Sequence, residues 1–222
     1  MPATPIYIVC SPRPQVGKTL LARLLSEFLL LKNGEALAFD IAIREPSLID
    51  YVPDVTETAE IDDTYGKIQL MDRVIIDDGV AKVIDLGYYS FDEFFKMSEE
   101  IGFLKEAARR NVAPVVLFCA DTDRLSLRAY DGLQHQIPRS HLITVENEHV
   151  LRDDLPDWIK QGRTLRIPAL PLFLKTYIDR LSFSFTGYLR REKDTSTELH
   201  QWIRHNYYTL RELEHGLILQ RS

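Results

Sequence analysis

The sequence has few cysteines and no long apolar run, and these shortages exclude several classes of protein. Two cysteines occur in 222 residues, Cys10 and Cys119, and each lies inside an apolar run. Two such thiols cannot build the disulfide framework of a small secreted domain, so we expect them to be buried and reduced. No apolar stretch reaches the ~20 residues that a membrane-spanning helix needs. The first ten residues lack the pattern of a signal peptide, so we expect a cytoplasmic protein.

The chain also has fewer positive than negative residues, and its formal net charge is -6 at pH 7. An acidic chain is a poor general coat for nucleic acid, and the small cluster of Arg190, Arg191 and Lys193 leaves such contact as a minor option. The six histidines are scattered without metal-site spacing. With 45% apolar and 27% charged residues, the composition is that of an ordinary globular protein.

Short apolar runs alternate with longer helical patterns along the chain, which indicates a mainly parallel sheet with helices on both faces. The length suits one α/β domain over residues 1–222, with a helical C-terminal extension over 170–222. Near residue 78, two apolar runs flank a predicted turn at Asp77, Asp78 and Gly79, and a strand follows it. Other expected strands are 5–10, 35–40, 113–121, 140–147 and 162–170, and expected helices are 18–32, 91–110 and 124–133.

The loop after the first expected strand carries most of a phosphate-binding pattern. Gly17, Lys18 and Thr19 satisfy the end of G-x-x-x-x-G-K-[ST], but Pro12 occupies the place of the first glycine. Such a loop works between a buried strand and a helix N-terminus, where backbone amides and the helix dipole favour an anion. Because the cradling amides come mainly from the second half, Pro12 and Pro14 change the shape of the entrance more than the number of donors.

The pattern therefore predicts a nucleotide site. Lys18 would neutralise the charge of the β- and γ-phosphates, and the Thr19 hydroxyl would hold Mg²⁺ beside them. The predicted nucleotide-binding residues of the loop are Gln15, Val16, Gly17, Lys18, Thr19 and Leu20.

With these residues the chain resembles the ParA/MinD-like ATPases, whose loop reads K-G-G-x-G-K-T. The signature lysine of that family falls on Arg13, and its two glycines fall on Pro14 and Gln15. The resemblance implies a single P-loop NTPase domain that binds ATP with Mg²⁺. It also implies a nucleotide-dependent homodimer, in which Arg13 would reach the partner's phosphates as a catalytic group. Arginine keeps the charge and can hold phosphate oxygens with two bonds. An exposed loop arginine is the alternative interpretation.

The same family carries D-x-D at the end of its second strand, and Asp40 matches one of these aspartates. By spacing from Lys18, Asp40 is the first, and Ala42 occupies the place of the second, which orients the attacking water. A shifted alignment, supported by Arg44, makes Asp40 the second and Ala38 the first. One carboxylate is missing in either alignment. In the first alignment the missing group is the one that orients the water, so weak or absent hydrolysis is expected there. A capping or turn aspartate is the alternative role for Asp40.

Two aspartates compete for the metal-binding position of the next strand. We prefer Asp85 in "KVIDLG" to Asp77 in "RVIID", because Gly87 follows it as in loops that sense the γ-phosphate. Asp85 would then hold Mg²⁺ with Thr19, and Asp77 would be a turn residue. The segment "VIDLGYYSFDEFF" also resembles the V-D-x-G-x-x-x-F stretch of ParA-like proteins of plasmid conjugal transfer and mobilization.

Asn147 follows the expected strand "ITVEN", where the family places an asparagine that reads the adenine edge. A loop-capping asparagine is the alternative. At the end of the chain, Leu210, Leu213 and Leu217 recur at helical spacing. Because acidic residues dilute the charge beside them, core packing or a partner interface suits this helix better than membrane targeting.

The resemblance implies a nucleotide-dependent switch in plasmid or chromosome partitioning, mobilization or positioning, acting with an unknown protein partner. Two alternatives remain at this stage. One is an ATP-dependent small-molecule ligase or kinase resembling dethiobiotin synthetase, which would need a substrate pocket lined by further polar groups. The other is a P-loop interaction module that does not hydrolyse nucleotide.

Overall fold

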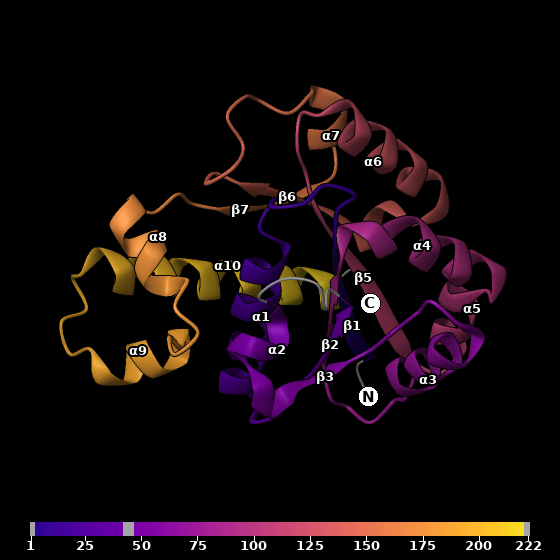
Figure 1. Ribbon diagram of the computed structural model, residues 1–222, viewed down its shortest axis with the longest axis horizontal. Coiled ribbons are helices and arrows are strands. Elements are labelled where there is room, and N and C mark those ends of the chain that lie inside the picture. Colours follow the sequence, from indigo (N-terminus) through magenta and orange to yellow (C-terminus); the bar gives the residue numbers. More distant parts are fainter. Residues whose placement is uncertain (1–2, 42–46, 220–222) are drawn as a thin grey trace.

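The computed structural model describes residues 3–41 and 47–219, in which strands alternate with helices (Figure 1). The strands are β1 (Thr4–Cys10), β2 (Leu37–Ile41), β3 (Thr56–Thr58), β4 (Lys82–Leu86), β5 (Val112–Cys119), β6 (Leu142–Asn147) and β7 (Arg163–Ile167). The helices are α1 (Lys18–Asn33), α2 (Leu48–Tyr51), α3 (Thr64–Val74), α4 (Phe91–Glu100), α5 (Phe103–Arg109), α6 (Arg124–Gln136), α7 (Asp157–Lys160), α8 (Leu172–Ile178), α9 (Phe185–Arg191) and α10 (Glu198–Leu219).

The seven strands of the described residues form one sheet in the order β3-β2-β4-β1-β5-β6-β7, and every pair is parallel. In this register Asp40 of β2 lies opposite Asp85 of β4. The carboxyl ends of parallel strands meet at one edge of a sheet, where open α/β folds bind their ligands. The predicted α/β class with a parallel sheet is therefore confirmed.

Alternate side chains of each strand enter two separate cores. Tyr7 and Val9 of β1 face one core, which contains the apolar side of α1, whereas Ile6 and Ile8 face the other, which contains α4 and α6. Figure 1 shows α1 and α8–α10 on one side of the sheet and α3–α6 on the other. Helices thus cover both faces, as the alternating pattern predicted.

Helix α1 forms where the sequence predicted it. Leu21, Leu24, Leu25 and Phe28 recur at helical spacing and are all buried. The helix ends at Gly34, which adopts a left-handed φ of 80° and donates its N–H to the carbonyl of Leu30 at 3.0 Å. The packed face of α1 holds the phosphate loop against the sheet.

The prediction of one helix over Phe91–Arg110 is wrong. Two helices, α4 and α5, occupy this segment, and they are separated at Ile101 and Gly102. Gly102 has a φ of 67°, which ends α4 and begins α5, because a left-handed residue cannot continue a right-handed helix. Neither α2 nor the edge strand β3 was predicted, since three or four residues are too few for a periodic signal. The first apolar run before the turn at residue 77 lies largely in α3.

The C-terminal helix α10 packs against α1 within one core. Its buried side chains include Leu199, Trp202, Ile203, Tyr207, Leu210 and Leu217. The prediction of core packing for this helix is confirmed. In the part of the chain that the structure describes, no helix combines the length and apolar character needed to cross a membrane. Cys10 and Cys119 are buried free thiols, as expected.

Candidate functional site

The phosphate-loop segment lies between β1 and α1 at the carboxyl edge of the sheet. Two of its residues have left-handed backbones, Gln15 with φ 59° and Gly17 with φ 91°. Between them, Val16 turns its side chain into the core and is 2% exposed. The sequence Gln15 to Gly17 therefore wraps around the start of α1, as a loop that cradles an anion must.

Lys18 and Thr19 begin α1 and make defined contacts. The Lys18 Nζ donates a hydrogen bond of 2.6 Å to the carbonyl oxygen of Arg13, so the loop curls around its own lysine. The hydroxyl of Thr19 donates to Asp85 Oδ2 at 2.7 Å. Leu20 follows and packs against the core on its partly buried side. Thr19 and Asp85, which the sequence assigned to one metal, thus lie in direct contact.

Two carboxylates occupy the floor of the site, because Asp40 and Asp85 are opposite each other on neighbouring strands and both are 0% exposed. Burial raises the pKa of Asp85 to about 7, and Asp40 adds to this rise while the bond from Thr19 and the charge of Lys18 oppose it. Asp85 Oδ1 is buried and has no hydrogen-bond partner within the described residues. Hydroxyl and carboxylate oxygens are ligands that Mg²⁺ uses together with substrate phosphates.

The alternative carboxylate, Asp77, lies at the other edge of the sheet. It accepts a hydrogen bond from the Thr4 hydroxyl at 2.6 Å and one from Asn111 Nδ2 at 3.2 Å. Thr4 begins β1, whereas the phosphate loop follows the end of that strand. Asp77 is therefore a turn residue remote from the loop.

Arg13 is held by carboxylates of its own chain. Its side chain lies 3.5 Å from Asp121 and 3.8 Å from Asp123, and it is 38% exposed. A role across a dimer stays a prediction, because it requires Arg13 to leave these two partners. Ala42 and Arg44, on which the two D-x-D alignments depend, lie outside the described residues. Asp40 itself accepts the backbone N–H of Ile49 at 3.0 Å.

Asn147 supports the loop from behind. Its Nδ2 donates to the carbonyl of Val16 at 3.1 Å, and its Oδ1 accepts the N–H of His149 at 3.2 Å. The amide lies so close to Gly17 that a Cβ there would stand 2.1 Å from Nδ2, which requires glycine. Asn147 is 3% exposed. Adenine recognition by Asn147 stays a prediction, and the bonds of its amide assign it to loop support.

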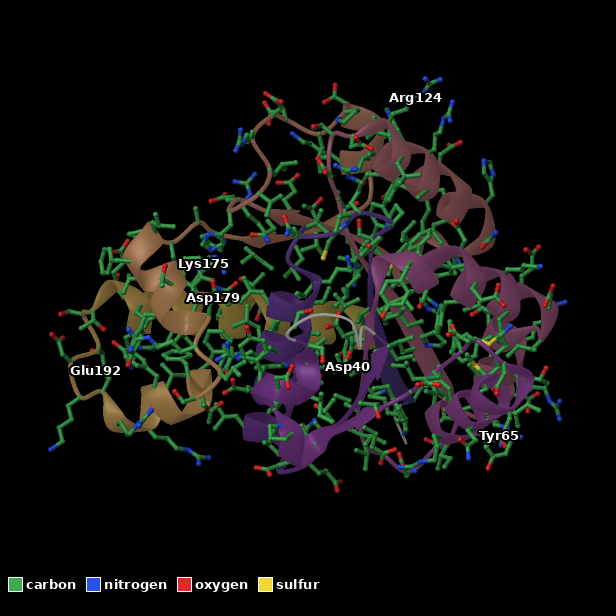
Figure 2. All side chains as sticks on the ribbon, in the orientation of Figure 1. Asp40, Tyr65, Arg124, Lys175, Asp179 and Glu192 are labelled. Carbon is green, nitrogen blue, oxygen red and sulfur yellow. The ribbon has the colours of Figure 1, made fainter. Side chains whose placement is uncertain are left out.

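The loop forms one wall of a cavity of about 310 Å³. The other walls contain side chains that the sequence did not single out. Lys175 and Asp179 come from α8 and its C-terminal end, and Figure 2 shows them beyond α1 from Asp40. Further lining residues are Arg23, Tyr51 and His149. The one sequence signal for Lys175 and Asp179 was their i,i+4 spacing, which does not tell where the helix packs.

Hydrogen bonds from α1 and α2 hold helix α8 beside this cavity. Arg23 of α1 donates to the carbonyl of Ile178 at 2.6 Å, and the Tyr51 hydroxyl donates to the carbonyl of Asp179 at 3.3 Å. Lys175 forms a close ion pair with Asp179. The cavity therefore combines residues of the predicted phosphate loop with a charged pair supplied by the C-terminal region, and its lining residue Thr19 contacts the buried Asp85.

Neither a protein-family model nor a curated protein matches the sequence significantly. Among solved structures, the chain is similar to a candidate plasmid partition protein of Borrelia burgdorferi B31 that was crystallised with AMPPNP. The two share 15% sequence identity over the whole of both chains, with a TM-score of 0.48. Because a likeness at this level does not carry function, the geometry of the loop and its cavity provides the functional argument.

Proposed function

We propose that this chain binds ATP with Mg²⁺ and acts as a nucleotide-dependent switch of the ParA/MinD-like type, in plasmid or chromosome partitioning, mobilization or positioning. The observation that carries the proposal is the contact of Thr19 with Asp85 beside Lys18, at the N-terminus of α1. A cation suited to phosphate, oxygen atoms suited to a metal and the first amides of a helix thus lie close together, which supports the proposal.

In this proposal the residues have distinct roles. Lys18 exchanges its bond to the Arg13 carbonyl for phosphate oxygens. Thr19 and Asp85 hold Mg²⁺, which neutralises phosphate charge when bound. Asp85 Oδ1, which has no hydrogen-bond partner among the residues that the structure describes, favours this assignment, since a buried carboxylate oxygen without a donor is costly unless a ligand satisfies it. Asp40 adds negative charge beside the metal position.

Calorimetric titration with ATP, with and without Mg²⁺, tests the proposal. We expect Lys18→Ala to abolish binding while thermal unfolding shows an intact fold, because a loop lysine carries charge and little core. Lys96, whose side chain is 70% exposed on α4, provides the control variant Lys96→Ala. Asp85→Asn should reduce the effect of Mg²⁺ far more than Asp77→Asn. Absence of ATP binding by the unaltered protein would refute the proposal.

We further propose that bound ATP is hydrolysed slowly or not at all. Loss of a group that orients the attacking water costs on the order of 10²-fold or more in rate. Ala42 occupies the position of that group in the unshifted alignment, and alanine cannot orient water. Single-turnover hydrolysis at saturating ATP should be slow in the unaltered protein and faster in Ala42→Asp. Brisk turnover without the substitution, or no gain from it, would favour Asp40 as the working carboxylate.

A further inference from the structure

The cavity extends beyond what phosphate binding uses. Gly17, Lys18 and Thr19 form its phosphate wall, whereas His149 and the α8 pair of Lys175 and Asp179 belong to the remaining wall, together with Arg23, Ser47, Tyr51, Tyr88, Tyr89 and others. Its volume of about 310 Å³ falls in the range of small-molecule sites. A base that lies against the α8 side of this wall would meet Lys175 and Asp179.

Asn147, the residue that was expected to read the base, supports the loop instead. The Asn147 amide is committed on both sides, through Nδ2 to the Val16 carbonyl and through Oδ1 to the His149 N–H. Moving it would withdraw support from Gly17, against which it packs. Base recognition is thus better supplied by groups that are not holding the loop.

Three polar side chains line the cavity near one another. His149 Nε2 is buried and has no hydrogen-bond partner in the described part of the chain. Burial, followed by the charge of Lys175, lowers the pKa of this imidazole, whereas Asp179 opposes the fall. The ring is therefore neutral at pH 7 and can bond to N7 of either purine, so it does not discriminate between them.

Lys175 and Asp179, the charged pair of α8, can discriminate between guanine and adenine. A carboxylate has two oxygens with about four lone-pair sites, so the Lys175 bonds leave room on Asp179 for further donors. Guanine presents two adjacent donors, N1–H and the N2 amino group, beside the acceptor O6. Adenine presents one exocyclic amino group beside the acceptor N1. Two acceptor oxygens beside an ammonium therefore match guanine better.

The pair is also held firmly enough to select a base. Arg23 binds the carbonyl of Ile178 and Tyr51 binds that of Asp179, so the end of α8 is tied to α1 and α2. A side chain on a helix with fixed neighbours keeps the alignment that two parallel hydrogen bonds need. Side chains of Lys175 and Asp179 are 27% and 47% exposed, which leaves them open to the cavity.

We propose that Lys175 and Asp179 read the nucleobase and favour guanine over adenine. This inference rests on the proposed function, since it requires the phosphates of a nucleotide to sit in the loop. It extends that function to GTP as a ligand that binds at least as tightly as ATP.

Titration with GTP, ATP and inorganic tripolyphosphate, all with Mg²⁺, tests the inference on the full chain. We expect Asp179→Asn to weaken GTP binding about tenfold or more, and to reverse the preference toward ATP, because an asparagine amide matches the donor and acceptor of adenine. Tripolyphosphate carries no base, so its affinity for the Asp179→Asn variant should stay within about twofold of its affinity for the unaltered protein. Thermal unfolding verifies that the variant folds.

Glu100→Gln provides a matched control, because Glu100 pairs with Lys96 at the same i,i+4 spacing on α4, which packs on the other face of the sheet. It should leave all three affinities unchanged. Tighter binding of ATP than GTP by the unaltered protein, or a GTP-to-ATP ratio that Asp179→Asn does not move, would overturn base reading while nucleotide binding stands. Absence of binding by all three ligands would overturn both proposals.

Discussion

The buried position of Asp85 lowers the stability of the ligand-free folded protein when the carboxyl is ionised. Its carboxyl is fully buried next to Asp40, and burial raises its pKa from the ordinary 3.8 to about 7. The folded state therefore binds a proton more tightly than the unfolded state does. The stability that this proton provides is present below about pH 4 and is lost as pH rises through about 7. Above that pH the folded protein carries a buried charge that the Thr19 hydrogen bond and the charge of Lys18 offset only in part.

At the residue scale we therefore expect Asp85→Asn to stabilise the ligand-free protein above pH 7, by a few kcal/mol on the order of the pKa shift. The asparagine oxygen can still accept the Thr19 hydroxyl, and it carries no charge to bury. The melting temperature of the variant, compared with the unaltered protein at pH 5 and pH 8, checks this. An equal gain in melting temperature at pH 5 and at pH 8 would contradict ionisation of buried Asp85 as the cause.

One buried ion pair of α1 adds polar contacts to the apolar packing between α1 and the C-terminal region. Arg23 is 2% exposed and lies 3.5 Å from Glu27, one turn along α1. Glu27 in turn accepts the Ser184 hydroxyl at 2.7 Å and the N–H of Thr186 at 2.9 Å. Arg23 and Glu27 thus both hold the segment that joins α8 to the start of α9. The phosphate loop and the far wall of the cavity share this support, since Arg23 also binds the end of α8.

At the element scale we expect Arg23→Met to destabilise the protein by about 3–5 kcal/mol, because it leaves the Glu27 carboxylate buried without its partner. Arg23→Met combined with Glu27→Gln should cost less than the sum of the single changes. Urea unfolding of the four proteins measures this coupling. Arg73→Met is the control, since it breaks the exposed pair with Glu57 and should cost below about 1 kcal/mol. Strict additivity would refute the coupling.

For the whole molecule, the position of Arg13 bears on the homodimer that the resemblance to ParA/MinD-like ATPases implies. Its contacts with Asp121 and Asp123 are partly exposed and longer than a good ion pair, at 3.5 and 3.8 Å. Such pairs contribute at most about 1 kcal/mol. Arg13 can therefore leave them at small cost when a partner's phosphates come within reach.

We expect the chain to sediment as a monomer alone and as a dimer with Mg²⁺ and a non-hydrolysable ATP analogue. Arg13→Ala should weaken the dimer, and Asp121→Asn should strengthen it by releasing Arg13. The exposed Arg124, at the start of α6, provides the control Arg124→Ala, which should change neither state. Sedimentation velocity measures all four proteins. A dimer that forms equally well without Arg13 would exclude its role across the interface.

Much of the carboxyl edge of the sheet could be predicted from local patterns. A buried strand, a glycine, a lysine and a threonine in succession are adjacent in the chain, so they predict a loop and a helix start without knowledge of distant contacts. The same holds for Asp85, since it ends an apolar run. Its closeness to Asp40 depends on the pairing of β2 with β4, and no local pattern encodes that order.

The sequence by itself thus determined a parallel α/β sheet with a strand-loop-helix start at α1, and it predicted a phosphate loop there and a C-terminal helix suited to core packing or a partner interface, because periodicity and residue succession act over a few turns. Tertiary structure alone decided that Asn147 supports Gly17 and that Lys175 and Asp179 complete the cavity. Arg23 and Ile178, which bring α8 there, are 155 residues apart. An apolar helix face indicates burial but not its partner, so only the folded packing of such distant segments places these side chains beside the loop.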